Sequence, residues 1–257
     1  MGYHSIIYIF LFLPVCLFVY QLAPEKWRGR VLLGFSWIFF YLLSGKLLVY
    51  LLGTTLLTHC IGIWLTVIRM QEAKAVEGLE RKQKKAVKME YQKKGRRVLA
   101  LGIFILLGIL GYLKYFDFFT VNLSHLFGHP VLEGWRPENL LMPIGISFYT
   151  LQAIGYMTDV YWGTIQAETE IWRTALFLGF FPQIMEGPIA RYSDVADTLY
   201  TGKSLEYRNV VDGYVRIFWG LFKKMVIADR MALMVNQVFD HYLSLIHISE
   251  PTRLLSI

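Results

Sequence analysis

Apolar runs long enough to cross a lipid bilayer dominate this sequence. Residues 4–23 contain no Lys, Arg, Asp or Glu, and residues 47–68 and 98–120 are further apolar runs. About 20 such residues in a helix span the ~30 Å hydrocarbon core of a membrane. The whole chain is 55% hydrophobic with a mean hydropathy of +0.43, above the roughly 45–50% of soluble domains. The sequence therefore predicts an all-α polytopic membrane protein.

The positive charge is concentrated in one segment. Residues 69–97 hold eleven Lys or Arg and four Glu, a net charge of +7 that equals the net charge of the whole chain. Because this segment joins two apolar runs, it indicates membrane topology and no nucleic-acid partner is expected. The positive-inside rule places it in the cytoplasm, so residues 121–139 are expected outside. The charge spacing also allows a surface helix that lies against anionic lipid headgroups.

One apolar run is short for a membrane span. Residues 29–46 contain only 13 consecutive apolar residues, from Val31 to Leu43, which is less than a bilayer core requires. If this run crosses, shielded by protein, residues 24–30 are cytoplasmic and the N-terminus is outside. Residues 4–23 lack a basic start and a small-residue cleavage site, so we interpret them as a retained span.

Residues 121–139 combine Leu, Phe and Trp with Gly, Pro and His, and predict an irregular segment at the external interface. His125 and His129 have the i, i+4 spacing of a helical metal pair. Gly128 and Pro130 flank the second His and no third ligand is near, so we expect no metal site.

Two consecutive apolar segments are interrupted by helix breakers and polar residues. The first, Leu140–Gly163, contains breakers and polar side chains at Pro143, Gly145, Ser147, Gln152, Gly155, Thr158 and Asp159. The second is apolar from Ala175 to Phe181 and then continues with Pro182, Gln183, Glu186, Gly187, Pro188 and Arg191. Broken backbone at membrane depth is tolerated only where protein buries it or where it borders a water-filled cavity. The pattern predicts a cavity-lined core, although kinked structural helices with Glu186 and Arg191 paired remain an alternative.

Three motifs in this order carry a family resemblance. They are "MPIGISFYTLQAIGYMTDVYWG" (142–163), "FFPQIMEGPIARYSD" (180–194) and "GLFKKMVIADRMA" (220–232). Together they resemble the membrane-bound O-acyltransferase (MBOAT) family, in the bacterial branch typified by alginate O-acetyltransferase. The resemblance covers roughly residues 5–243 and implies a helical bundle with broken or re-entrant helices. The sister branch that transfers D-alanine to teichoic acid shares some of these Pro and Gly positions.

The resemblance implies a reaction. Family members transfer an acyl group from a thioester donor to a hydroxyl, with a membrane-embedded His as general base, a role that contributes roughly 10²–10⁴-fold in rate. The implied donor is acetyl-CoA or an acyl carrier, used as substrate with no bound cofactor. The implied acceptor is an envelope polysaccharide, with a secreted or membrane-anchored SGNH-type acetyltransferase or esterase as partner. The implied location is the bacterial cytoplasmic membrane, as a multi-pass protein in contact with lipid.

The family's catalytic His contexts, Trp-His-Gly and Phe-Trp-Arg-Arg-Trp followed by His, are absent from residues 1–257. The catalytic residue is therefore unknown, and His59, on an apolar face, is interpreted as a core His. We expect this chain alone to be inactive. Residues 1–243 are expected to be the N-terminal half of an MBOAT domain, truncated at the C-terminus, and residues 244–257 a non-native tail.

The resemblance implies roles for two groups of residues. One group would line the tunnel or hold its broken helices: Ser147, Gln152, Gln183, Glu186, Arg191 and Tyr192. Another would face an anionic donor from a cytoplasmic helix end, or anchor topology: Lys223, Lys224 and Arg230. A transporter or scaffold with broken helices is the alternative of another class, but the halves of the chain show no internal repeat.

Overall fold

The computed structural model describes residues 3, 5–77, 80–127, 142–185 and 187–240. Every regular element among these residues is a helix, and they contain no strand. Residues 7–203 form one compact unit, and the described residues 204–240 belong to another. The predicted fold class, an all-α membrane protein, is confirmed.

The first unit begins with a short apolar helix followed by a longer one. A π-helical turn, η1 (Tyr8–Phe12), continues into α1 (Leu13–Leu22), and α2 (Glu25–Ser44) follows. The stretch Tyr8–Leu22 is shorter than the span predicted for residues 4–23. Buried residues of α2 recur at helical spacing from Leu33 to Phe40, which gives one inward face.

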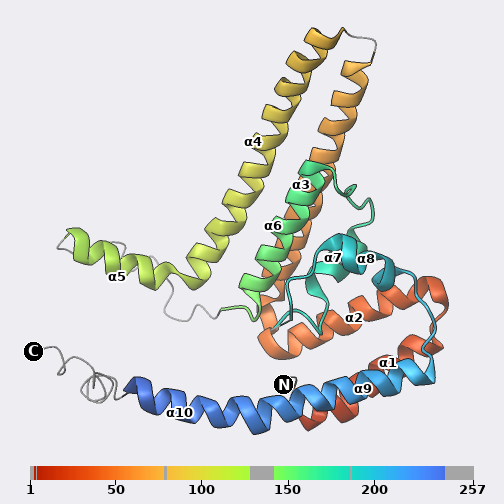
Figure 1. Cartoon of the computed structure of the whole chain (residues 1–257), viewed down its shortest axis with the longest axis vertical. Helices are drawn as coiled ribbons and strands as arrows, with labels where there is room; N and C mark the ends of the chain where they lie inside the picture. Colours follow the sequence, from red (N-terminus) through yellow and green to blue (C-terminus); the bar gives the residue numbers. More distant parts are fainter. Residues whose placement is uncertain (1–2, 4, 78–79, 128–141, 186, 241–257) are drawn as a thin grey trace, which may run out of the picture. The chain divides into compact units, whose positions relative to one another are not determined.

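A long helical hairpin follows. A 3₁₀ turn, η2 (Gly45–Leu47), leads into α3 (Leu48–Val76), which pairs with α4 (Arg81–Lys114) as Figure 1 shows. Among the described residues, the stretches Glu25–Val76 and Lys82–Lys114 are long and apolar enough to cross a membrane. The described residues of the basic segment, 69–97, extend these two helices and form no separate surface helix.

The end of α4 differs from the prediction. The apolar run 98–120 was expected to be one helix, but α4 ends at Lys114 and α5 (Phe116–Phe127) begins after Tyr115. Tyr115 has a non-helical backbone conformation, φ −111° and ψ 8°, which separates the two helices. Residues 121–127, predicted to be irregular, are helical, because they continue α5, whose first turn is closed by the bond from the amide of Phe119 to the carbonyl of Tyr115 at 3.0 Å. Residues 128–139, with His129, lie outside the described residues.

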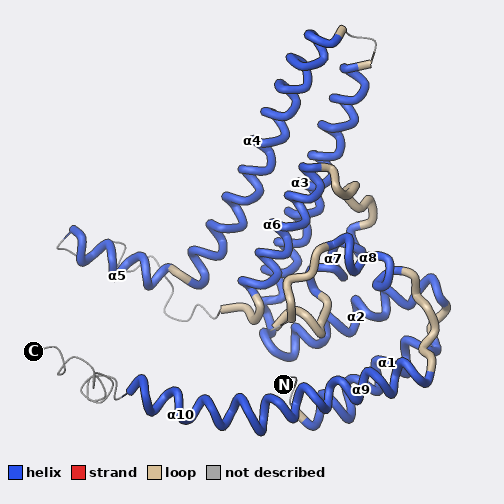
Figure 2. Tube along the Cα trace, viewed as in Figure 1, coloured by secondary structure: helices blue, strands red, loops and turns tan. Residues whose placement is uncertain are grey.

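Three further helices complete the first unit. α6 (Ile146–Trp162) packs against both helices of the hairpin, and α7 (Ile171–Gly179) packs against α2 and α3. The short α8 (Tyr192–Tyr200) contacts α7 and α2. Irregular segments join α6 to α7 and α7 to α8, drawn as tan tube in Figure 2. A hydrophobic core cluster joins α3, α4, α6, α7 and α8 through residues that include Ile61, Leu65, Leu106, Ala153, Tyr156, Met157, Phe177 and Tyr192.

The second unit is a succession of helices. α9 (Tyr207–Phe222) continues through a π-helical turn, η3 (Lys223–Ala228), into α10 (Asp229–Asp240). Several of its large apolar side chains are exposed, among them Val215, Trp219, Met225 and Leu233.

Glycines with left-handed backbone define both ends of α6. Gly145 (φ 72°) precedes its first residue, and Gly163 (φ 76°) follows its last one. The interruption predicted at Pro143 and Gly145 is therefore confirmed. Gly155 was predicted to interrupt the helix as well and does not, because its backbone keeps a helical conformation inside α6.

The position of Gly145 is closed to any side chain. A Cβ atom built on it would lie 1.9 Å from the backbone oxygen of Ile184. The turn before α6 thus lies directly against the segment that follows α7. The two interrupted segments of the sequence meet at this contact.

We predict that Gly145→Ala lowers the stability of the protein by more than about 2 kcal/mol, because left-handed backbone and a backbone clash both oppose a Cβ. Gly155→Ala is the matched control, since no atom lies within 4 Å of its added Cβ. Ala there should leave stability unchanged or raise it by about 0.5–1 kcal/mol. Thermal unfolding of the whole protein in detergent measures both, and equal melting temperatures for the two variants would contradict the assigned contact.

Candidate functional site

The segment after α7 folds into a tight turn. The backbone amides of Gln183 and Ile184 donate to the carbonyl of Phe180 at 2.9 and 3.2 Å, and the amide of Gly187 donates to the carbonyl of Gln183 at 3.0 Å. Pro182 lies within this turn and has no amide hydrogen to offer. The break predicted at Pro182 is confirmed, with α7 ending shortly before it at Gly179.

Two serines of α2 accept hydrogen bonds from backbone amides in the two interrupted segments. The amide of Phe181 donates to Ser36 Oγ at 3.2 Å, and the amide of Ile144 donates to Ser44 Oγ at 3.2 Å. The hydroxyl of Ser36 donates in turn to the carbonyl of Leu32 at 2.7 Å. One helix therefore satisfies a backbone donor in each broken segment, where an unbonded amide away from water would cost several kcal/mol.

Aromatic rings of other helices pack against Phe181 of this turn. The ring of Phe181 lies 5.4 Å from that of Phe12 and 5.8 Å from that of Phe39, centroid to centroid. Tyr8 adds an edge contact at 6.3 Å. These distances and tilted geometries are those preferred by aromatic pairs. The turn is thus held by aromatic packing on the Phe181 side chain and by a hydrogen bond from the Phe181 amide.

Two of the predicted site residues meet at Phe177 of α7. The side chain of Gln152 is buried and its Nε2 donates to the carbonyl of Phe177 at 3.0 Å. Tyr192 is also buried, and its ring packs edge-on against Phe177 at 5.0 Å and against Tyr156 at 5.1 Å. Gln152 from α6 and Tyr192 from α8 therefore hold the same residue from different helices.

A polar network continues from Tyr192 to Glu168. The Tyr192 hydroxyl donates to the Glu168 carboxylate, and Arg173 Nη1 lies 3.6 Å from the other carboxylate oxygen. The backbone amide of Glu168 donates to the Tyr156 hydroxyl at 2.8 Å, and the Tyr200 hydroxyl donates to the carbonyl of Arg173 at 2.7 Å. Burial, and next the hydrogen bond to Glu168, raise the pKa of the Tyr192 phenol, so it remains a proton donor.

His59 of α3 lies in the same core. Its Nδ1 is 3.3 Å from the Thr174 hydroxyl of α7, and both side chains are buried. This matches its interpretation as a core His with a satisfied ring nitrogen. Among the described residues His125 is the other His, and it is exposed on α5. The remaining four, His4, His129, His241 and His247, lie outside the described residues, and no catalytic base is assigned.

Comparison with known proteins finds relatives that are all named as enzymes of acyl transfer. The chain is 30% identical over 254 residues to the probable alginate O-acetylase AlgI of Azotobacter vinelandii, which is 98% of this chain and 45% of that protein. It is 31% identical over 173 residues to the peptidoglycan O-acetyltransferase of Helicobacter pylori, covering 57% of this chain and 32% of that protein. It is 31% identical over 93 residues to the teichoic acid D-alanyltransferase of Bacillus subtilis, covering 35% of this chain and 24% of that protein.

The chain belongs to the membrane-bound O-acyltransferase family. The resemblance noted in its motifs is thereby confirmed. The chain spans less than half the length of the curated relatives it matches. No family model matches the sequence, and no solved structure matches it.

The other predicted tunnel residues that the structure describes are less buried than Gln152 and Tyr192. Ser147 is half-buried and its hydroxyl accepts a bond from Lys114 Nζ at 3.0 Å. Arg191 is exposed at the start of α8, and Gln183 is half-buried within the turn after α7. Glu186 lies outside the described residues, as does any pairing of it with Arg191.

The residues expected to face the acyl donor lie in the second unit. Lys224 Nζ is 3.2 Å from each carboxylate oxygen of Asp229, which makes it an ion pair across the π-helical turn η3. Lys223 Nζ lies 5.5 Å from the centre of the Trp219 ring. The side chain of Arg230 is exposed. Their donor-facing role stays a prediction.

Sequence reasoning missed the residues that hold the broken backbone. Ser36 and Ser44 lie about two turns apart in an apolar helix, and that placement was the available signal. Glu168 lies a few residues before an apolar segment, and Thr174 is the first residue of that segment. Nothing in the sequence distinguishes either of them from a surface residue. Tyr192, which bonds the Glu168 carboxylate, and His59, which bonds Thr174, lie 24 and 115 residues away, beyond the reach of spacing rules.

We predict that Tyr192→Phe lowers the stability of the whole protein by about 1–3 kcal/mol, because Glu168 then loses a buried donor. Tyr207→Phe is the matched control, since Tyr207 is 86% exposed on α9, and it should change stability by less than about 0.5 kcal/mol. Thermal unfolding in detergent compares the two. A Tyr192→Phe variant as stable as the control would show that the network contributes nothing.

Proposed function

We propose that the protein to which this chain belongs is a membrane O-acyltransferase that moves an acyl group, most simply acetyl, to hydroxyls of a cell-envelope polysaccharide. The observation that carries the proposal is similarity of about 30% identity to alginate O-acetylases over nearly the whole chain. The relatives' names agree on transfer of an acyl group to an envelope polymer.

The fold offers a physical role for this part of the protein. Two broken segments are held against each other by Gly145, Ile184 and the serines of α2. At membrane depth, such irregular backbone is tolerated only where protein buries it or where it lines a water-filled cavity, and an acceptor or donor path through the bilayer would be such a cavity. In this proposal Gln183, on the turn after α7, and Glu186 would line the path, while Gln152 and Tyr192 hold α7 in place.

The donor in this proposal is a cytoplasmic acyl thioester, acetyl-CoA or an acyl carrier, and the protein resides in the bacterial cytoplasmic membrane as a multi-pass protein. Lys223, Lys224 and Arg230 would meet the anionic donor. The acyl group would pass on to the envelope polysaccharide directly or through an SGNH-type partner outside the membrane. A catalytic base is required for attack by a hydroxyl, and its residue stays open.

The test is complementation of a host that lacks envelope O-acetylation. The whole protein should restore acetyl esters on the polysaccharide, whereas Gln183→Ala and Glu186→Ala should each lower them at least about tenfold while remaining in the membrane fraction. Gln166→Ala is the matched control, because Gln166 is exposed in the segment between α6 and α7. Full activity from both turn variants would contradict their role.

Amino-acid analysis of the same envelopes separates acetyl transfer from D-alanyl transfer. The similarity to a teichoic acid D-alanyltransferase covers only 35% of this chain, so we expect acetate and no added D-alanine. Release of D-alanine in place of acetate would favour the sister activity. Neither product from a membrane-inserted protein would favour a transporter or scaffold.

A further inference from the structure

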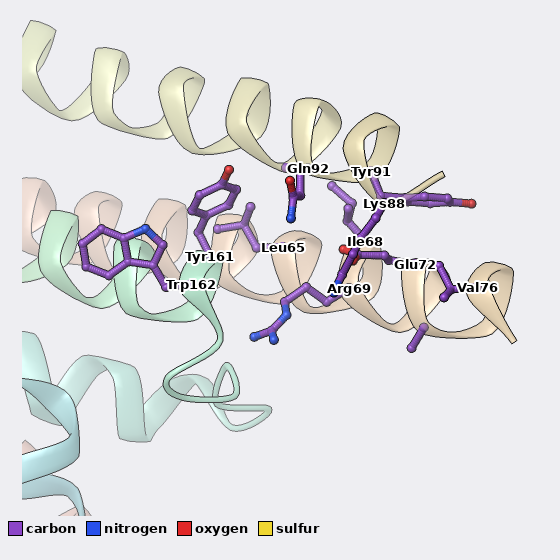
Figure 3. A pocket seen from close by; sticks show the side chains of 12 residues that line it. Leu65, Ile68, Arg69, Glu72, Val76, Lys88, Tyr91, Gln92, Tyr161 and Trp162 are labelled. Carbon is purple, nitrogen blue, oxygen red and sulfur yellow. The ribbon is translucent and has the colours of Figure 1, made fainter. Parts of the chain in front are cut away.

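A polar pocket lies between α3 and α4 near the tip of their hairpin. It has a volume of about 610 Å³ and is bounded by the C-terminal end of α6 (Figure 3). Its lining includes the apolar residues Leu65 and Ile68, the aromatic residues Tyr91, Tyr161 and Trp162, and the cations Arg69 and Lys88. None of the residues considered for acyl transfer lines this pocket.

The lining changes in character along the hairpin. Leu65 and Ile68 are buried, whereas Trp162 at the end of α6 is 70% exposed. Lys88 lies further toward the hairpin tip and is exposed as well. The cations Arg69 and Lys88 thus lie nearer the hairpin tip than the buried Leu65 and the aromatic residues Tyr161 and Trp162 (Figure 3). Basic residues on the cytoplasmic side of a span and aromatic residues at its interface are both typical of the headgroup layer of a membrane.

The two cations of the pocket are available to an anion. Among the described residues, neither Arg69 nor Lys88 forms an ion pair or a hydrogen bond with another side chain. The Arg69 guanidinium lies against Gly163, where a Cβ would come within 1.3 Å of Nη1, so it stands at the end of α6. Glu72 is the single acidic residue of the lining, and the surrounding segment 69–97 carries a net charge of +7.

We infer that this pocket binds the phosphate of an anionic phospholipid headgroup, such as that of phosphatidylglycerol. Arg69 offers paired N–H donors that match phosphate geometry, and Lys88 adds a second charge from the facing helix. The lipid's acyl chains would lie along the apolar side near Leu65. Tyr161 and Trp162 have the amphipathic rings that favour the headgroup layer. Bound there, the lipid would join the two arms of the hairpin to α6.

The experiment uses the whole protein, purified in neutral detergent and freed of lipid. Short-chain phosphatidylglycerol is added in increasing amounts and the melting temperature is followed, because a ligand that binds only the folded state raises it with concentration. Phosphatidylcholine with the same chains and inorganic phosphate are the parallel arms. We expect stabilisation by phosphatidylglycerol, and none by the other two at equal concentration.

The pocket variant is Arg69→Gln with Lys88→Gln, and the matched control is Lys74→Gln with Lys85→Gln. The control removes the same charge from exposed side chains that do not line the pocket. The pocket variant should need at least about tenfold more phosphatidylglycerol for the same shift, whereas the control should respond as the wild type does.

Equal responses from the pocket variant and the control would overturn the site and leave only general surface charge. An equal shift from inorganic phosphate would overturn the assignment to a lipid, and an equal shift from phosphatidylcholine would overturn the assignment to an anionic headgroup. If the pocket variant does not fold, Lys88→Gln against Lys85→Gln repeats the comparison, because both side chains are exposed. The readout is lipid binding, so it is independent of the proposed acyl transfer.

Discussion

Backbone amides in an interrupted helix need partners wherever water is absent, and the first unit of this chain is organised around that need. The amides of Phe181 and Ile144 donate to serines of a single helix, α2. Because both bonds come from one helix, the two interrupted segments are held at a fixed distance along it. The direct contact of Gly145 with the carbonyl of Ile184 then leaves no room between them.

The buried polar side chains of the unit continue the same arrangement. Gln152 bonds the carbonyl of Phe177, and Tyr192 packs on the ring of that residue. Glu168 is bonded on both its carboxylate and its amide, which joins the segment before α7 to α6 and α8. Gln152, Tyr192 and Glu168, whose polar groups would be costly to bury alone, are thus paired. In the proposed acyltransferase, these bonds would hold the irregular backbone in one conformation.

The sequence predicted the class of fold and the interruptions, because apolar length and the chemistry of Pro143, Gly145 and Pro182 act locally. It predicted one interruption too many at Gly155, since a glycine without a required positive φ can remain helical. It also predicted a helix through Tyr115, where the chain bends. A local sequence pattern cannot predict the continuous helix at Gly155 or the helix end at Tyr115, because both depend on the residues that pack beside them.

Among the candidate site residues, Gln152 and Tyr192 are buried and share Phe177 as a partner, whereas Ser147 and Arg191 are more exposed. A polar candidate residue in these segments was buried only where another part of the fold supplied a carbonyl or a carboxylate as its hydrogen-bond partner. The serines of α2 were missed because the sequence does not show which backbone groups they bond. Their partners are backbone amides about 100 residues or more away, and a backbone amide has no sequence signature.

Hydrogen–deuterium exchange of the whole protein in lipid nanodiscs tests the central role of the α2 serines most directly. The peptide that contains Phe181 should exchange slowly in the wild type, because its amide is bonded to Ser36 and shielded by aromatic rings. Ser36→Ala should speed that exchange by about tenfold and leave peptides of α4 unchanged. Identical exchange at Phe181 in the wild type and the variant would contradict the account.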